Sequence, residues 1–370
     1  MANKILNTPG GDGQIPAGKV LVGNGYTGNL STFNGKIFVF DFEYTPDPYN
    51  PLNLPPNTIR LLFRDGVTPS FTKGTGVQVS SSPNVWDLTY NNNDWSYLLD
   101  ENEKSHDLLE VLGANTDGVR NMTNTFRSCE NLRKVATFNT SSVTNFYQMF
   151  KECTNLTTVP KYDTSNARDI TEMFCSCTNL ITIPLFDTHN VTNMYGLFNS
   201  CTNLKTVPLL DTSNTTDMTL MFSDCKSLTE IPLFDTSKVT DMDWMFSDCN
   251  ITTVPLFNTE SVIDMSCMFY NCTSLTSVPL FNTQNVTNMA NMFYRCEELT
   301  NILLFNTTKV TNVESMFSHC YKVQNGALAL YQQMSSQISP PENHNETFEY
   351  CGRNSTTGAA ELAQIPSDWK

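Results

Sequence analysis

The amino-acid sequence predicts an α/β repeat solenoid, a coil of short parallel strands and short helices preceded by an all-β domain. Three observations lead to this fold class. One motif recurs at a fixed interval along most of the chain, each copy divides into a helix-type half and a strand-type half, and strand alternation precedes the first copy. Because such units stack on their neighbours, the array is expected to bury one continuous core.

The repeated unit is 24 residues long. In nine consecutive copies a phenylalanine stands three residues before a cysteine, from Phe126 and Cys129 to Phe317 and Cys320. One interval shortens to 23 residues where Cys249-Asn-Ile replaces the Cys-Thr-Asn-Leu of other units, and the next copy returns to register. A fixed period of this size indicates a solenoid.

The first half of each unit predicts a short helix. Its apolar residues recur at steps of three and four, which places them on one helical face. In one unit these residues are Val191, Met194, Leu197, Phe198 and Cys201. An Asp-Thr or Asn-Thr pair precedes this half in successive units, and its side-chain oxygens suit the free amides of a first helical turn.

The second half of each unit predicts a short strand that lies parallel to its copies. Residues Leu204 to Leu209 have the pattern L-x-x-V-x-L, and Val207 and Leu209 are expected to point inward. The proline at position 208 recurs in other units and removes a donor from the ladder each time. We therefore expect strands of about three residues, with the chain continuing extended beyond the proline.

These units resemble those of the BspA-like leucine-rich-repeat surface proteins, in the branch with the signature D-T-S-x-V-T-D-M-x-x-M-F-x-x-C-x-x-L-x-x-I/V-P. The resemblance covers roughly residues 108–323. It implies a right-handed leucine-rich-repeat coil that serves as a surface-displayed scaffold for adhesion or recognition, and it does not imply catalysis. The ligands of that family vary too much to be transferred.

Four parts of the chain are predicted. Residues 1–30 are rich in glycine and form an extended arm, which either packs on its own domain or anchors the chain in a virion or in sister subunits. Residues 31–107 form a small β domain that caps the solenoid. The solenoid of about nine units spans 108–323, and residues 324–370 form a degenerate last repeat that acts as the C-terminal cap.

Two tryptophans of the β domain allow two interpretations. Trp86 and Trp95 are either aromatic anchors of a small core or a pair on which a carbohydrate stacks.

Charge and hydropathy exclude two classes of partner. The 37 acidic and 22 basic residues give a net charge of −15, which disfavours binding to nucleic acid. No apolar stretch is long enough to enter a membrane, and the first residues lack the apolar core and cleavage site of a secretion signal.

An adhesin-like array without export signals predicts a phage-encoded member of the family, released by lysis and mounted on the virion surface as a fibre, tail or head decoration. It would contact other virion proteins through the arm and bind a host surface protein or glycan. A homotrimer suits such an arm. Two alternatives stand: an adhesin on a bacterial cell surface, and a purely structural virion decoration without an external ligand.

Two columns of repeated positions are candidate ligand-binding surfaces. The first is a polar row on the sheet face, formed by Thr158, Thr182, Thr206, Glu230, Thr253 and Ser277. The second is an aromatic column just past the strand, formed by Tyr162, Phe186, Phe234, Phe257, Phe281 and Phe305. If strand alternation continues past the proline, these rings point outward and form a binding face. The alternative is that the chain turns after the proline and places each ring in the core.

The repeated cysteines are expected to form one buried structural column of reduced thiols, because parallel Cβ vectors in a stack are poorly placed for disulfides. This column comprises Cys153, Cys177, Cys201, Cys225, Cys249, Cys272 and Cys296. The aspartates at 163, 187, 211 and 235 would also stack. They are interpreted as caps of helices and turns, with a calcium column as the alternative.

Catalysis, cofactors and metals find no support in the sequence. The four histidines are scattered, no nucleophile elbow or phosphate-cradling glycine loop is present, and no C-x-x-C pair recurs. We therefore expect a non-enzymatic protein without a cofactor or a metal site.

Overall fold

The computed structural model describes residues 4–6, 37–39, 50, 52–71, 73–79, 82, 84–90, 92–99 and 107–370. The chain divides into two units, Met1–Pro48 and Tyr49–Lys370. In the first unit, β1 (Lys4–Leu6) pairs antiparallel with β2 (Ile37–Val39). Most of the predicted arm, and its boundary at residue 30, lie outside the described residues.

The second unit begins with a five-stranded sheet in the order β4-β5-β3-β6-β7. Its strands are β3 (Thr58–Phe63), β4 (Thr75–Gln78), β5 (Val85–Thr89), β6 (Leu108–Asn115) and β7 (Lys134–Val135). Every pair is antiparallel except β6 and β7, which are parallel. Strand β6 therefore belongs both to the antiparallel sheet and to the parallel stack that follows it.

The sheet owes its packing to alternating apolar residues in β3. Ile59, Leu61 and Phe63 point to the same face and are buried. Trp95 is also buried and stacks on a tyrosine ring at 5.5 Å, and Trp86 packs against the same core. The structure thus places both tryptophans as core anchors.

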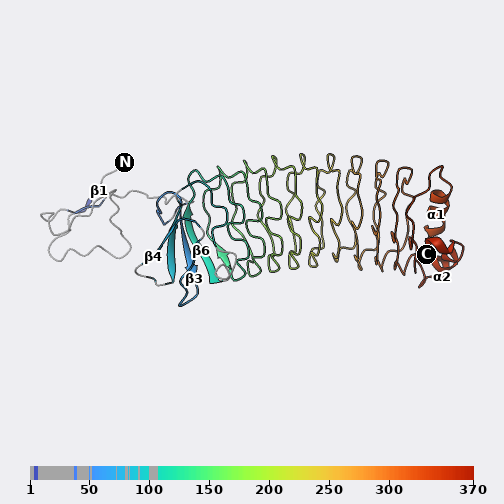
Figure 1. Ribbon diagram of the computed structural model, residues 1–370, viewed down its shortest axis with the longest axis horizontal. Helices are drawn as coiled ribbons and strands as arrows, with labels where there is room; N and C mark the ends of the chain where they lie inside the picture. Colours follow the sequence, from blue (N-terminus) through green and yellow to red (C-terminus); the bar gives the residue numbers. More distant parts are fainter. Residues whose placement is uncertain are drawn as a thin grey trace. The chain divides into compact units, whose positions relative to one another are not determined.

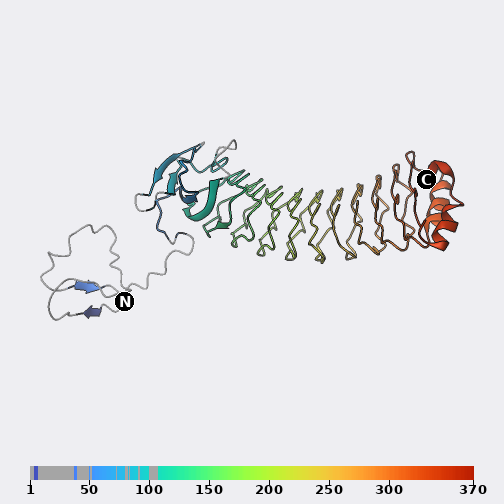
Figure 2. The same ribbon diagram turned by 90° about the horizontal axis from the view of Figure 1, so that it is seen from below.

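The parallel stack is a repeat solenoid whose coils lie side by side in one row (Figures 1 and 2). Bridges between equivalent residues join most neighbouring coils, from the bridge of Asp94 with Asn121 to that of Asn312 with Asn343. The coils of Asp169 and Asn193 are joined by backbone bonds such as that from the Glu172 amide to the Tyr195 carbonyl, at 3.0 Å. In the first of these bridges, Asp94 lies before residue 108, the predicted first residue of the solenoid.

The predicted short helices are wrong: within the repeats this half of each unit is a run of turns. Amide groups alternate between two kinds of partner in the coil that contains Phe198. Those of Met194, Gly196, Phe198 and Ser200 donate to carbonyls of the next coil, whereas those of Leu197, Asn199 and Cys201 donate three residues back in their own coil. Every one of these amides is therefore bonded without a helix.

Left-handed residues make these turns possible. Gly196 and Ser200 have φ angles of 57° and 60°, and a positive φ recurs at the equivalent positions of other coils. Apolar residues three and four apart still point inward, which is why the pattern resembled a helix. An isolated segment of this length is also too short to form a stable helix by itself.

The core of the stack is a column of stacked rings. The phenylalanine of each F-x-x-C motif packs on its counterparts in the neighbouring coils, with ring centroids 5.1 to 5.9 Å apart. This column ends at Phe348, which belongs to the degenerate repeat that sequence analysis placed near the C-terminus.

Helices α1 (Ala327–Ser335) and α2 (Thr356–Leu362) and the 3-10 helix η3 (Ser367–Trp369) complete the chain. Buried Trp369 lies 6.5 Å from the ring of Phe348, and its carbonyl accepts the Phe348 amide at 2.9 Å. These contacts cover the last ring of the core column.

Candidate functional site

The most conspicuous surface of the repeat stack is a row of exposed leucines. One leucine follows the proline position in each of six successive coils, and 52–61% of each residue is exposed. We call this row the leucine column; it comprises Leu185, Leu209, Leu233, Leu256, Leu280 and Leu304. The sequence pattern did not predict this column, because Leu209 was expected to point into the core.

The chain reverses its alternation at the proline position. Val207 is buried as expected, but Leu209 is 60% exposed and Leu210 is 2% exposed. The cause is visible in the coil of Leu233, where the Phe234 amide donates to the Pro232 carbonyl at 2.9 Å. A bond between residues two apart closes a γ-turn centred on the leucine and directs its side chain outward. The same bond recurs in two later coils, from Phe257 and Phe305.

This turn overturns the prediction that the aromatic column is a ligand-binding face. All six of its members are buried: Tyr162, Phe186, Phe234, Phe257, Phe281 and Phe305. They lie against the rings of the F-x-x-C motifs, with centroids 6.1 Å apart for Phe174 and Phe186 and 6.0 Å apart for Phe222 and Phe234. The column is therefore part of the core.

The predicted polar row lies on the surface. Thr158, Thr182, Thr206, Glu230, Thr253 and Ser277 are all exposed. Among the six residues of this row, one parallel β-bridge forms, between Thr182 and Thr206. Their hydroxyl oxygens lie 3.4 Å apart. The row stands three residues before the leucine column in each coil, so it forms one border of that column.

The other border is formed by the Asp-Asn column, whose members stand two residues after each leucine and after Lys161 in the preceding coil. Its members are Asp163, Asp187, Asp211, Asp235, Asn258, Asn282 and Asn306. In each of them a side-chain oxygen accepts the amide two residues later, at 3.0 to 3.3 Å. These bonds close Asx turns, which aspartate and asparagine form equally well.

Hydrogen bonds lower the pKa of Asp187, Asp211 and Asp235 in this column. The hydroxyl and amide of Ser213 bond to the carboxylate of Asp211 and lower its pKa, and a hydrogen bond from His189 does the same for the pKa of Asp187. No group of three or more histidine, cysteine or acidic residues that could hold a metal ion occurs in the described part of the chain.

The leucine column, the polar row and the Asp-Asn column together form a surface that we call the leucine face. Its apolar centre has one mostly uncharged polar border and one border that changes character along the stack. That border consists of four aspartates followed by three asparagines.

The seven predicted cysteines of the structural column are buried inside the stack as free thiols. Each thiol donates to the carbonyl of a phenylalanine in the preceding coil, at 3.0 to 3.2 Å. Burial raises the pKa of each thiol, in Cys249 to about 12. Such protonated thiols are poor nucleophiles and poor metal ligands.

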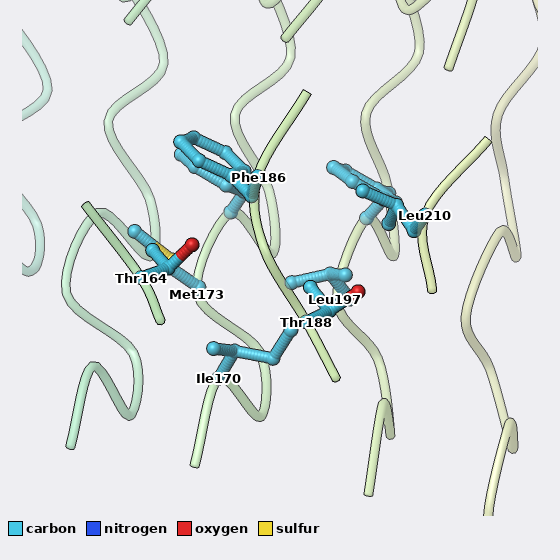
Figure 3. Close-up of a pocket in the computed structure, with 9 residues that line it drawn as sticks. Thr164, Ile170, Met173, Phe186, Thr188, Leu197 and Leu210 are labelled. Carbon is cyan, nitrogen blue, oxygen red and sulfur yellow. The ribbon is translucent and has the colours of Figure 1, made fainter. Parts of the chain in front are cut away.

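A small cavity of about 10 Å³ lies inside the stack where Leu210 replaces the ring of the other coils. Figure 3 shows Phe186, Leu210 and Leu197 among the side chains that surround it. Its volume suffices for about one water molecule, so it cannot hold a substrate.

One protein family matches the chain three times. The family described as "Mycoplasma protein of unknown function, DUF285" matches residues 94–206, 179–277 and 250–355. The search of curated proteins found no match. No helix in the described residues is long and apolar enough to cross a membrane.

Three solved structures of leucine-rich-repeat and receptor proteins are similar to the chain. The leucine-rich-repeat protein of T. pallidum is 16% identical, with 75% of this chain and 98% of that one covered and a TM-score of 0.23. The plant peptide hormone receptor RGFR1 in complex with RGF2 is 10% identical, with 59% and 50% covered and a TM-score of 0.22. The Toll–Spatzle complex of Drosophila is 14% identical, with 61% and 42% covered and a TM-score of 0.18.

Proposed function

Because the chain belongs to the family described as "Mycoplasma protein of unknown function, DUF285", a family of BspA-like repeat proteins, we propose that it is a non-enzymatic recognition protein displayed on a surface. The leucine face is the part that binds a partner. The observation that supports this proposal most strongly is the leucine column, because contiguous exposed apolar patches on soluble proteins generally mark interaction sites.

The architecture of the face suits binding without chemistry. The leucines are held by a backbone whose amides bond within each coil and to the next one, so their spacing is regular and little order is lost on binding. The thiols of the stack are buried and protonated, and the cavity is too small for a substrate. These features favour adhesion over catalysis.

Two settings for this surface protein are proposed. The first is the virion, with residues 1–30 attached to other virion proteins or to sister subunits in a trimer, and with a host surface protein or glycan as ligand. The second is a bacterial cell surface, which the description of the family supports because it names a bacterium. A decoration without an external ligand is the remaining possibility.

Immunogold labelling of residues 108–320 on purified particles and on fractionated host cells separates these settings. Label on particles supports the virion, and label on envelopes of uninfected cells supports the cell surface. In parallel, the full chain is tested for retention on cells beside Leu233→Lys and Ile263→Lys. Ile263 is 50% exposed and lies outside the leucine face, so its variant is the matched control.

We expect Leu233→Lys to reduce retention and Ile263→Lys to leave it unchanged. Equal retention of all three proteins would refute recognition through the leucine face.

A further inference from the structure

We propose that the partner of the leucine face is the leucine face of a second copy of this chain, with the two stacks antiparallel and related by a twofold axis. This inference rests on the proposed function and gives it a partner. The leucine face is complementary to itself in apolar contacts, in charge and in size.

The leucine column is symmetric about its midpoint. A twofold axis placed between the coils of Leu233 and Leu256 sets each of these residues opposite the other in the second copy. The same operation pairs the remaining leucines from the centre outward, so all six meet a leucine of the other copy. An apolar row that is half exposed in one chain thereby becomes covered in the pair.

Charge gives the strongest argument for the antiparallel arrangement. The same axis sets the aspartates opposite the asparagines: Asp235 opposite Asn258, Asp211 opposite Asn282, and Asp187 opposite Asn306 of the second copy. Each pair joins a carboxylate that accepts hydrogen bonds to an amide that donates them. A register that set the acidic half against itself would place like charges opposite one another.

The aspartates have spare capacity for such bonds. Asp211 and Asp235 are exposed and take part in no ion pair among the described residues, and their carboxylates accept hydrogen bonds from the turn that each one closes. The carboxylate oxygens that the Asx turn leaves free can therefore accept from asparagine amides of a second chain.

The polar row is also compatible with this axis. Its one charged member, Glu230, meets Thr253 of the second copy, and Thr206 meets Ser277. Thr182 meets Asn301, which is the next exposed residue of the row. No two charges of the same sign are opposed, and each pair contains at least one hydrogen-bond donor.

The size of the face indicates a weak dimer. Six coils at strand spacing extend about 29 Å, and the five residue steps from the polar row to the Asp-Asn column extend about 17 Å. Two such footprints bury roughly 1,000 Å² in total, which is the lower limit for a specific interface. A dissociation constant in the micromolar range is expected. Weak antiparallel contacts of this kind suit adhesion between two surfaces that each display many copies.

Sedimentation of the full chain over a concentration series tests the pairing. We expect a reversible monomer–dimer equilibrium that Leu233→Lys abolishes and the control Ile263→Lys leaves intact. Both residues are exposed, so both variants should keep the thermal unfolding curve of the parent, and this is checked first.

A charge-exchange cycle tests the antiparallel register, and each of its variants keeps the Asx turn. Asn282→Asp opposes two pairs of carboxylates across the axis and should weaken the dimer about tenfold. The double variant Asp211→Asn with Asn282→Asp restores each carboxylate–amide pair and should recover the parent affinity. Failure to recover would contradict a register in which residues 211 and 282 face each other between copies.

Three results would overturn the inference: a monomer at every concentration, equal dimerisation of both lysine variants, or a trimer that neither variant disturbs, which would assign association to residues 1–30. The retention experiment on cells stands apart from these results. A monomeric chain whose retention still requires Leu233 would keep the proposed function and exclude the second copy as its partner.

Discussion

Leu210→Phe should stabilise the coil in which the cavity lies. Leu210 occupies the position that an aromatic ring fills in the coils before and after it, and it borders the cavity (Figure 3). In the neighbouring coils that ring stacks on the F-x-x-C phenylalanine, as Phe234 does on Phe222 at 6.0 Å. A phenylalanine at 210 has the same neighbour available in Phe198, which also lines the cavity.

The expected gain is about 1 kcal/mol. One additional aromatic pair contributes about 0.5–1.5 kcal/mol. Filling a cavity of about 10 Å³ at about 24 cal/mol per Å³ adds only about 0.2 kcal/mol. Burial of the larger side chain adds roughly 1 kcal/mol, and fitting it into a packed core costs about the same.

Hydrogen exchange of the amides in the coils around residue 210 measures this gain, because a repeat stack does not unfold as one two-state unit. A gain of about 1 kcal/mol slows local opening about fivefold. The matched control is Phe234→Leu. It places a leucine in the next coil at the position equivalent to Leu210, and it should speed local opening by a similar or larger factor. Faster opening in Leu210→Phe, or no change in Phe234→Leu, would refute the reasoning.

Three further predictions concern buried polar groups. Thr188→Val removes a hydroxyl that donates to the Asp211 carbonyl at 2.7 Å and should cost about 1–2 kcal/mol in thermal unfolding, whereas Thr164→Val should be neutral or stabilising, because the buried Thr164 hydroxyl has no hydrogen-bond partner. Burial, with smaller effects from neighbouring aspartates, raises the pKa of Asp243 from 3.8 to about 6, so the folded state binds its proton more tightly and stability falls as pH rises through that window. Asp243→Asn should flatten this dependence and raise the urea midpoint at neutral pH by the equivalent of about 1 kcal/mol, after allowance for screening of a half-exposed group; an unchanged slope would contradict the assignment. Cys249, whose pKa is raised to about 12, should react with a thiol reagent only as fast as the stack opens; rapid labelling of the native chain would show that the column is accessible.

The repeat period and the burial of its apolar residues could be predicted from the spacing of the motif, because every copy has the same pattern. The backbone conformation within each unit could not be predicted from this spacing. Steps of three and four residues fit a helix, and they fit equally well a run of turns in which Gly196 and Ser200 are left-handed. Only the position of the neighbouring coil, which accepts alternate amides, decides between the two.

For a related reason, the sequence predicted the polar row of the leucine face but not its leucine column. The polar row could be placed on the surface by alternation up to Val207. After the proline, two apolar residues follow each other, and an extended chain directs only one of them inward. The sequence contains no direct sign of the γ-turn at Leu233, so the choice between leucine and aromatic ring was open. One available signal was that two apolar residues follow each other after the proline. Since an extended chain cannot direct both of them into the core, this pattern indicates a turn.

The bonds that join the coils connect only neighbours, so the number of coils can change while the contacts between the remaining coils stay the same. Amides, cysteine thiols and threonine hydroxyls all reach from one coil to its neighbour, and none of these bonds spans two coils. Recombination within the gene can therefore remove or duplicate one whole unit and leave every surviving joint intact. Loss or duplication of one of the six coils that carry the leucine column also removes or adds one exposed leucine, so the apolar area of the leucine face can change in discrete steps without any substitution.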